Sequence, residues 1–225
     1  MPSSNAPADK ILAILAFKSS STFSFSSLSS SVIKYIEENR LNANEYILRV
    51  SAILEDLKFS DDPAKQFEKA LNDAASVIGI TSSRPEVQFG GAAPDNLLAF
   101  SNSEYIIIEC KSRTTTEAIS KDDCEQLLSS IQWFKNHYIP GENYTPIIIH
   151  NSDTFRTEAS PSPDMRIMTP ELLDEFSRAI RRFAEGVVKN GVFGNNKEVE
   201  KLLNSYNLNG SQIINQYTKK FCKNK

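Results

Sequence analysis

Two apolar runs of strand length lie close together near the middle of the chain, and they restrict the fold more than any other sequence feature. The first run is residues 94–100, PDNLLAF, and the second is residues 105–111, YIIIECK. A short polar segment, residues 101–104, separates them. Two such runs joined by a short polar loop predict an antiparallel β-hairpin.

The register of this hairpin decides which side chains face each other at its open end. If Ala99 pairs with Tyr105, Asp95 lies opposite a second acid, Glu109. A shift by one residue would place Asn96 there instead, and the sequence is compatible with both registers. Two carboxylates that face each other across a strand pair repel. A divalent cation held between them would remove that repulsion.

The charged residues at the end of the second run suggest a reaction. Side chains alternate between the faces of a strand, so Glu109 and Lys111 lie on the same face. Carboxylate oxygens suit Mg²⁺, which can lower the pKa of a bound water and neutralise charge on a phosphorus centre. Lys111 could orient or deprotonate that water, or stabilise the anionic transition state. The pattern predicts metal-assisted hydrolysis, although a surface hairpin with a Glu–Lys pair would have the same residues.

These residues also match a known signature. Pro94–Asp95 followed by Glu109–Lys111 resembles the PD-(D/E)xK motif of restriction-endonuclease-like nucleases. The preceding residues 89–93, FGGAA, resemble the Gly-Gly approach to Pro-Asp in type IIS restriction cleavage domains. The resemblance covers about residues 62–185. Asn96 departs from the glycine usual after the aspartate, which concerns the geometry of the turn more than the chemistry.

The resemblance implies a fold and a metal site. The fold would be α/β, with a central mixed sheet flanked by helices. Asp95 and Glu109 would bind Mg²⁺ or Mn²⁺, and the backbone carbonyl of Cys110 would complete the inner coordination sphere. Lys111 would act on the attacking water.

Two helices are expected to add residues to the site. The first starts at the Asp-Pro pair 62–63 and runs to about residue 78, and Glu68 lies at the edge of its apolar face. The second opens with a capping box at Ser120 and runs to about residue 138, with Gln126 in its first turns. Nucleases of the resembled family often carry an acid on the first helix and a glutamine on the second. Each could equally be an ordinary surface residue.

Few residues are candidates for contact with nucleic acid. Ser112 and Arg113 follow the second strand and could contact phosphates, and Arg84 is a further candidate. The net charge of −3 opposes avid binding by the whole surface, because affinity for a phosphate backbone comes largely from Lys and Arg. Any contact must therefore be local or delegated to a partner.

Alternating strand and helix patterns indicate an α/β fold. We expect the restriction-endonuclease-like core at residues 61–190, a helical extension at 1–60 and a C-terminal helical tail at 191–225. Within the extension, residues 44–58 could be the recognition helix of a helix-turn-helix, but their charges favour a packing or dimerisation cap. Residues 86–89 are expected to form a short first strand.

Composition narrows the possible functions. The chain has only two histidines, and its three cysteines show no metal-binding spacing. This composition argues against a zinc site and against a Ser-His-Asp triad. No apolar run approaches membrane-spanning length and no signal peptide is evident, so we expect a cytoplasmic protein that does not enter membranes.

The leading hypothesis is a Mg²⁺-dependent endonuclease acting on DNA in restriction or anti-phage defence. A free nuclease endangers its own cell, so we expect a gate, either homodimerisation or a larger defence partner subunit. The alternatives are a non-catalytic subunit of the same fold for assembly or DNA binding, and an RNA-cleaving nuclease.

Overall fold

The computed structural model describes residues 27–61, 63–100, 104–138 and 143–222. The helices are α2 (Leu28–Glu38), α3 (Ala43–Asp56), α4 (Ala64–Val77), α5 (Pro85–Phe89), α6 (Lys121–His137), α7 (Pro170–Lys189), α8 (Asn196–Ser205) and α9 (Gly210–Tyr217). The strands are β1 (Thr81–Ser83), β2 (Asn96–Phe100), β3 (Glu104–Cys110), β4 (Asn143–Ile149), β5 (Arg166–Met168) and β6 (Lys219–Lys220).

The strands form one mixed sheet, and the predicted hairpin is at its centre. Within the described residues the sheet has six strands in the order β1-β2-β3-β4-β5-β6. The pairs β1–β2, β2–β3 and β5–β6 are antiparallel, and β3–β4 and β4–β5 are parallel. Ala99 pairs with Tyr105, which confirms the register that brings Asp95 toward Glu109.

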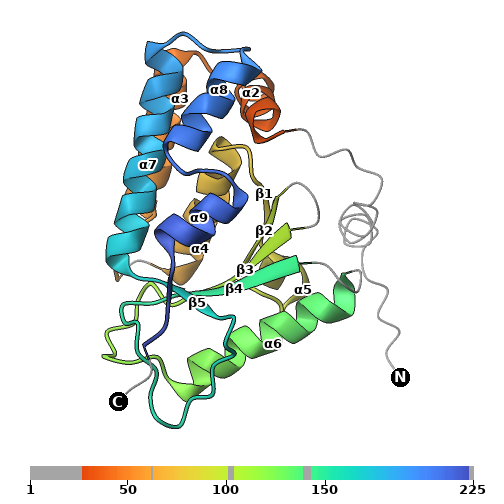
Figure 1. Ribbon diagram of the computed structural model, residues 1–225, viewed down its shortest axis with the longest axis vertical. Helices are drawn as coiled ribbons and strands as arrows, with labels where there is room; N and C mark the ends of the chain where they lie inside the picture. The colour runs from red at the N-terminus through yellow and green to blue at the C-terminus, as the bar shows by residue number, and fades with distance from the viewer. Residues whose placement is uncertain (1–26, 62, 101–103, 139–142, 223–225) are drawn as a thin grey trace.

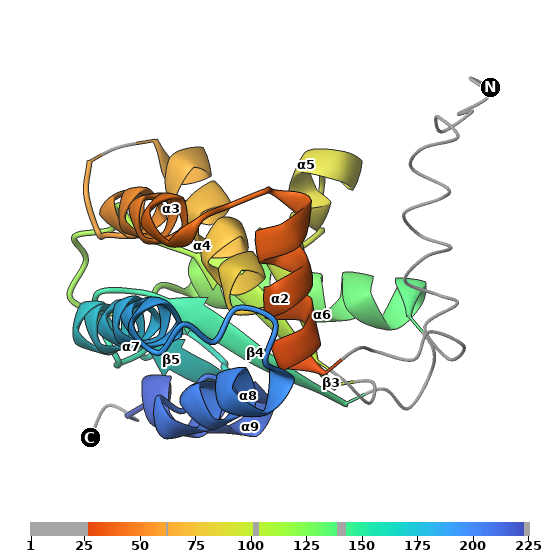
Figure 2. The same cartoon turned by 90° about the horizontal axis from the view of Figure 1, so that it is seen from above.

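Helices cover both faces of the sheet (Figures 1 and 2). Helices α2, α3, α4, α7, α8 and α9 form a thick layer on one face, where Leu98, Ile106 and Ile108 point into a large apolar cluster. Helix α6 lies across the other face, over the alternate strand residues Leu97 and Ile107. The chain therefore forms an α/β structure with a mixed sheet between helical layers, as the strand and helix patterns predict.

The start of α6 follows the predicted capping box. The Ser120 hydroxyl accepts a hydrogen bond from the backbone N–H of Asp123, and the Asp123 carboxylate accepts one from the backbone N–H of Ser120. Helix α4 begins one residue later than expected, at Ala64 with Pro63 as its N-cap. The aspartate expected to cap it, Asp62, lies outside the described residues.

The predicted strand at residues 86–89 is wrong. These residues belong to the helix α5, and the first strand is the preceding segment, β1. Pro85 occupies the first helical position, where its fixed φ favours a helix, and Glu86 in the first turn suits the positive end of the helix dipole. Gly90 then ends the helix with a φ of +66°.

The N- and C-terminal helices share a hydrophobic core with the sheet. Tyr46 of α3, Leu71 of α4 and Val199 of α8 belong to the same buried cluster. The Tyr46 hydroxyl also donates a hydrogen bond of 3.0 Å to the backbone carbonyl of Val77. Helix α3 thus packs through its apolar face, and residues 1–26 of the predicted extension lie outside the described residues. No helix in the described part of the chain has the length and apolar composition needed to cross a membrane.

Gly79 marks a close approach between two helices. It follows α4 with a φ of +82°, a conformation that L side chains rarely adopt. A Cβ atom there would lie 2.3 Å from the backbone carbonyl oxygen of Leu28, at the start of α2. Only glycine therefore lets α2 pack at this distance.

We expect Gly79→Ala to destabilise the fold by about 3 kcal/mol or more, because left-handed strain and a backbone clash both contribute. Gly191→Ala is the matched control, since Gly191 has a φ of +60° but nothing within 4 Å of the added Cβ. That variant should lose only about 1–2 kcal/mol. Urea unfolding followed by circular dichroism measures both, and equal losses would contradict the clash.

Candidate active site

The open end of the hairpin lies in a cleft of about 830 Å³ between α4, α5 and α6. Its lining is strongly acidic. The acidic residues are Glu68, Glu86, Asp95, Glu109, Asp122 and Glu125, and the basic residues are Lys65 and Lys111. All the predicted catalytic residues, including Gln126, therefore line one concave surface.

Asp95 is held by the partner strand. It stands immediately before β2, one step beyond the last strand pair, Asn96 with Ile108. Its Oδ2 accepts a hydrogen bond of 2.7 Å from the backbone N–H of Cys110. The confirmed register and this hydrogen bond together hold the Asp95 carboxyl beside that of Glu109.

Glu109 is held by helix α6. Its side chain is only 8% exposed, and its Oε1 accepts a hydrogen bond of 2.5 Å from the hydroxyl of Ser130. Lys111 lies on the same side of the strand, as predicted, with its Nζ 4.0 Å from the other oxygen, Oε2. Ser130 was missed by sequence analysis, although its position four residues after Gln126 places it on the same helix face.

Lys111 makes two further contacts with α6. Its Nζ donates a hydrogen bond to Oε1 of Gln126, the predicted glutamine. It also lies 3.8 Å from Oδ1 of Asp123. Asp123 therefore has two roles, because its other oxygen caps the start of the helix. The sequence indicated only the capping role.

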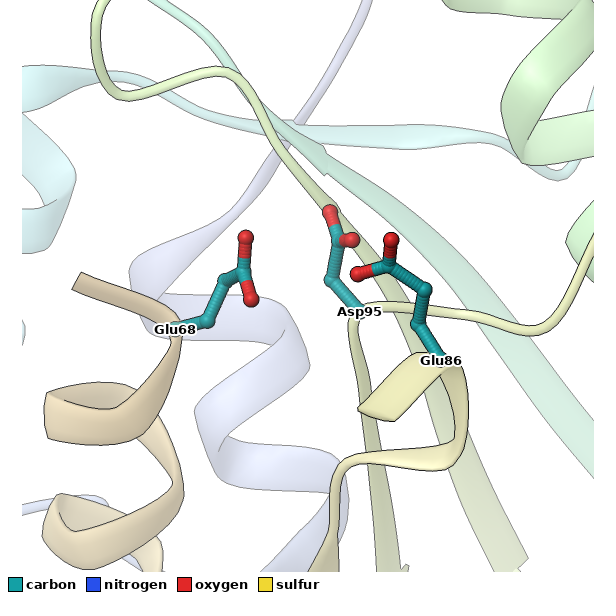
Figure 3. A group of neighbouring side chains, drawn as sticks. All are labelled: Glu68, Glu86 and Asp95. Atoms are coloured by element: carbon teal, nitrogen blue, oxygen red, sulfur yellow. The ribbon is translucent and has the colours of Figure 1, made fainter. Parts of the chain in front are cut away.

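Asp95 also belongs to a second group of acids. Glu68 of α4, Glu86 of α5 and Asp95 each offer a ligand oxygen, and these oxygens lie within 4.8 Å of one another. Figure 3 shows Asp95 between Glu68 and Glu86, with the three side chains on three different segments of the chain. Glu68 is 5% exposed, and its Oε2 accepts a hydrogen bond from Nη2 of Arg84. Glu86 was missed because its segment was predicted as a strand.

Asn96, the departure from the usual glycine, has a structural role. It is fully buried, and its Nδ2 donates a hydrogen bond of 3.0 Å to the backbone carbonyl of Glu68. Its Oδ1 lies 3.6 Å from Sγ of Cys110, which can donate a weak hydrogen bond to it. One side chain therefore joins α4 to both strands of the hairpin.

Burial and repulsion between carboxylates raise the pKa values of the two acids at the hairpin end. Burial, followed by the charges of Glu109 and Glu68, raises the pKa of Asp95 to about 8, against the opposing effects of the Cys110 N–H and Lys111. Burial also raises the pKa of Glu109, although its hydrogen bond from Ser130 and the charge of Lys111 act in the opposite direction. Near neutral pH these raised pKa values favour a proton on the buried pair of Asp95 and Glu109.

The remaining predicted residues lie around this centre. Cys110 lines the cleft, and burial raises the pKa of its thiol well above the usual value. Ser112 is 4% exposed, whereas the adjacent Arg113 is exposed. Arg84 points to Glu68. Contact of these last three residues with nucleic acid stays a prediction.

The polar atoms that meet in the cleft are mainly carboxylate oxygens. Carboxylate oxygens converge from two sides on Asp95, and a lysine ammonium adjoins one of them. Such oxygens are the ligands that Mg²⁺ and Mn²⁺ prefer. The donor atoms are therefore of the kind that suits a hard cation, with a hydrogen-bond donor beside them.

We expect Asn96→Ala to cost about 1–3 kcal/mol of stability, because it removes two buried contacts, the hydrogen bond from Nδ2 to the Glu68 carbonyl and the one that the Cys110 thiol can donate to Oδ1. Asn39→Ala is the control. Asn39 makes the same kind of hydrogen bond, to the carbonyl of Tyr35, but at an exposed position. Its loss should be below about 1 kcal/mol. Urea unfolding distinguishes the two, and a negligible effect of Asn96→Ala would contradict the assigned role.

Without metal, stability should fall as the pH rises from about 4 to about 8. Over this range folded Asp95 keeps a proton that the unfolded chain has lost, since its pKa is raised from 3.8 to about 8. Rising pH then favours unfolding, by at most about 1.4 kcal/mol per pH unit for this group. Urea unfolding in EDTA at several pH values measures the slope. Asp95→Asn should flatten it, and an unchanged slope in that variant would contradict the raised pKa.

Comparison with known proteins identifies no relative. The chain matches no family model. No curated protein and no solved structure shows significant similarity to it. The chemistry of the cleft must therefore be inferred from its own residues.

Proposed function

We propose that the protein is a metal-dependent endonuclease that hydrolyses phosphodiester bonds in DNA, built on a restriction-endonuclease-like core. The observation that carries the proposal is the meeting of Asp95, Glu109 and Lys111 at one end of a buried hairpin. These are the residues of the PD-(D/E)xK-like motif. The central mixed sheet, with α4 and α6 on opposite faces, agrees with such a core.

The donor set fits a hard divalent cation. Asp95 and Glu109 supply carboxylate oxygens, and the backbone carbonyl of Cys110, at the edge of the same cleft, would add a third oxygen. Bound Mg²⁺ or Mn²⁺ would lower the pKa of a coordinated water and neutralise the charge that builds on phosphorus. Asp95 must give up its proton when it becomes a ligand, so metal affinity should rise with pH.

The surrounding side chains orient the reacting groups. Ser130 holds one oxygen of Glu109 and leaves the other facing Lys111. Gln126 and Asp123 hold the Lys111 ammonium at the cleft. From there Lys111 can donate hydrogen bonds to the attacking water or to a phosphate oxygen in the transition state. Glu68 assists from α4, with a carboxylate oxygen within 4.8 Å of one of Asp95.

The charge of the cleft supports a gated enzyme. Six acidic residues and only two lysines line it, and the whole chain carries a charge of −3. Nucleic acid gains affinity mainly from Lys and Arg, so this surface alone should bind DNA weakly. We therefore include in the proposal a partner subunit or a second copy of the chain that completes the DNA-binding surface. Restriction or anti-phage defence is the setting suggested by analogy with the resembled nucleases.

Cleavage assays test the proposal. The purified chain is incubated with supercoiled plasmid, linear duplex, single-stranded DNA and RNA, in Mg²⁺, Mn²⁺ or EDTA. We expect slow metal-dependent cleavage of DNA, because the chain alone should bind DNA weakly. Asp95→Asn or Lys111→Met should each reduce this cleavage at least about 100-fold, because each removes charge from the reacting centre. Preferential cleavage of RNA would instead favour the ribonuclease alternative.

Asp174→Asn is the control for the loss of a carboxylate. Asp174 is exposed on α7, where it pairs with Arg178, and this variant should cleave as the wild type does. Equal cleavage by the wild type and the Asp95 and Lys111 variants would sink the proposal. So would a wild-type protein that takes up no Mn²⁺ in calorimetry, which would leave a non-catalytic subunit of this fold.

A further inference from the structure

The positively charged side chain of Arg84 lies beside the proposed metal site. Its guanidinium donates from Nη2 to Oε2 of Glu68, and the two side chains are only 18% and 6% exposed. Its Nε is buried without a hydrogen-bond acceptor among the residues described. A fixed positive charge this close to a cation site opposes cation binding. The neighbouring carboxylates must compensate for its desolvation.

Asp95 adjoins two groups of acids, and the two groups are not equivalent. One is Glu109, whose Oε2 lies 4.0 Å from the ammonium of Lys111. The other is the pair Glu68 and Glu86, with ligand oxygens within 4.8 Å of each other and of Asp95. These three acids have the oxygen spacing of another cation position, and one of them, Glu68, already pairs with the guanidinium of Arg84.

The charge balance favours one ion. Glu68, Glu86, Asp95 and Glu109 carry four negative charges when ionised, and Arg84 and Lys111 each carry one positive charge. The remaining charge of −2 equals that neutralised by one divalent ion. A second divalent ion bound to Glu68 would have to share that carboxylate with the guanidinium of Arg84.

We infer that Arg84 takes the place of a second divalent ion, so that each chain binds one metal ion, next to Asp95 and Glu109. This inference rests on the proposed function, and it adds a residue that sets the number of ions. In this arrangement Arg84 is a positioning residue. It holds Glu68 by one oxygen and supplies the positive charge that a second ion would otherwise bring.

The number of bound ions tests the inference directly. Metal-free full-length protein is titrated with Mn²⁺ at constant pH, and free Mn²⁺ is counted by electron paramagnetic resonance. We expect one ion per chain for the wild type and two for Arg84→Met. The two ions share Asp95, at about 4 Å from each other, so the bound spectrum should show spin coupling. Arg84→Lys keeps the positive charge and should bind one ion.

Arg178→Met is the matched control. Arg178 also pairs with a carboxylate, Asp174, but on the exposed surface of α7, so its loss should leave one ion bound. The wild-type count requires no substitution and stands even if Arg84→Met does not fold.

The outcomes separate this inference from the proposed function. Two ions on the wild type, or one ion on a folded Arg84→Met, would overturn the role of Arg84 and leave the metal-dependent nuclease intact. No bound ion on the wild type would overturn both. One ion on the wild type and two coupled ions on Arg84→Met would support both.

Discussion

The structure depends on burying two carboxyl groups, Asp95 and Glu109, next to each other at the end of a hairpin. Removing a carboxylate from water is costly, and a second one beside it adds repulsion. The fold offsets this cost with the backbone N–H of Cys110, the hydroxyl of Ser130 and the ammonium of Lys111. Cys110 belongs to the partner strand, Lys111 follows that strand, and Ser130 belongs to α6. The site therefore forms only when strand register and helix packing are both correct.

Two helices on opposite faces of the sheet meet this requirement together. Helix α6 contributes Ser130 and Gln126 from one face, and α4 contributes Glu68 from the other. Asn96 ties the backbone of α4 to the hairpin, so Glu68 cannot move independently of Asp95. A glycine in place of Asn96 would lack this connection. Asn96 is thus part of how this chain positions its acids.

Sequence patterns predicted the parts of the site that depend on local periodicity. The hairpin, the shared face of Glu109 and Lys111 and the capped start of α6 all follow from residues close together in the chain. Glu86 was missed because four residues are too few to distinguish a strand from a short helix, although the preceding Pro85 favoured the helix. The pairing of Arg84 with a residue on α4 depends on tertiary packing, which periodicity does not report. The strand β6 was also not predicted, because two residues are too few to show a periodicity.

The close approach at Gly79 also limits how this chain can diverge during evolution. Any side chain there would strike the backbone of α2, so substitution requires moving a whole helix away from the core. A change in the acidic residues of the cleft does not remove this contact. A descendant with other residues in the cleft would therefore still need glycine between α4 and β1 to keep α2 in place.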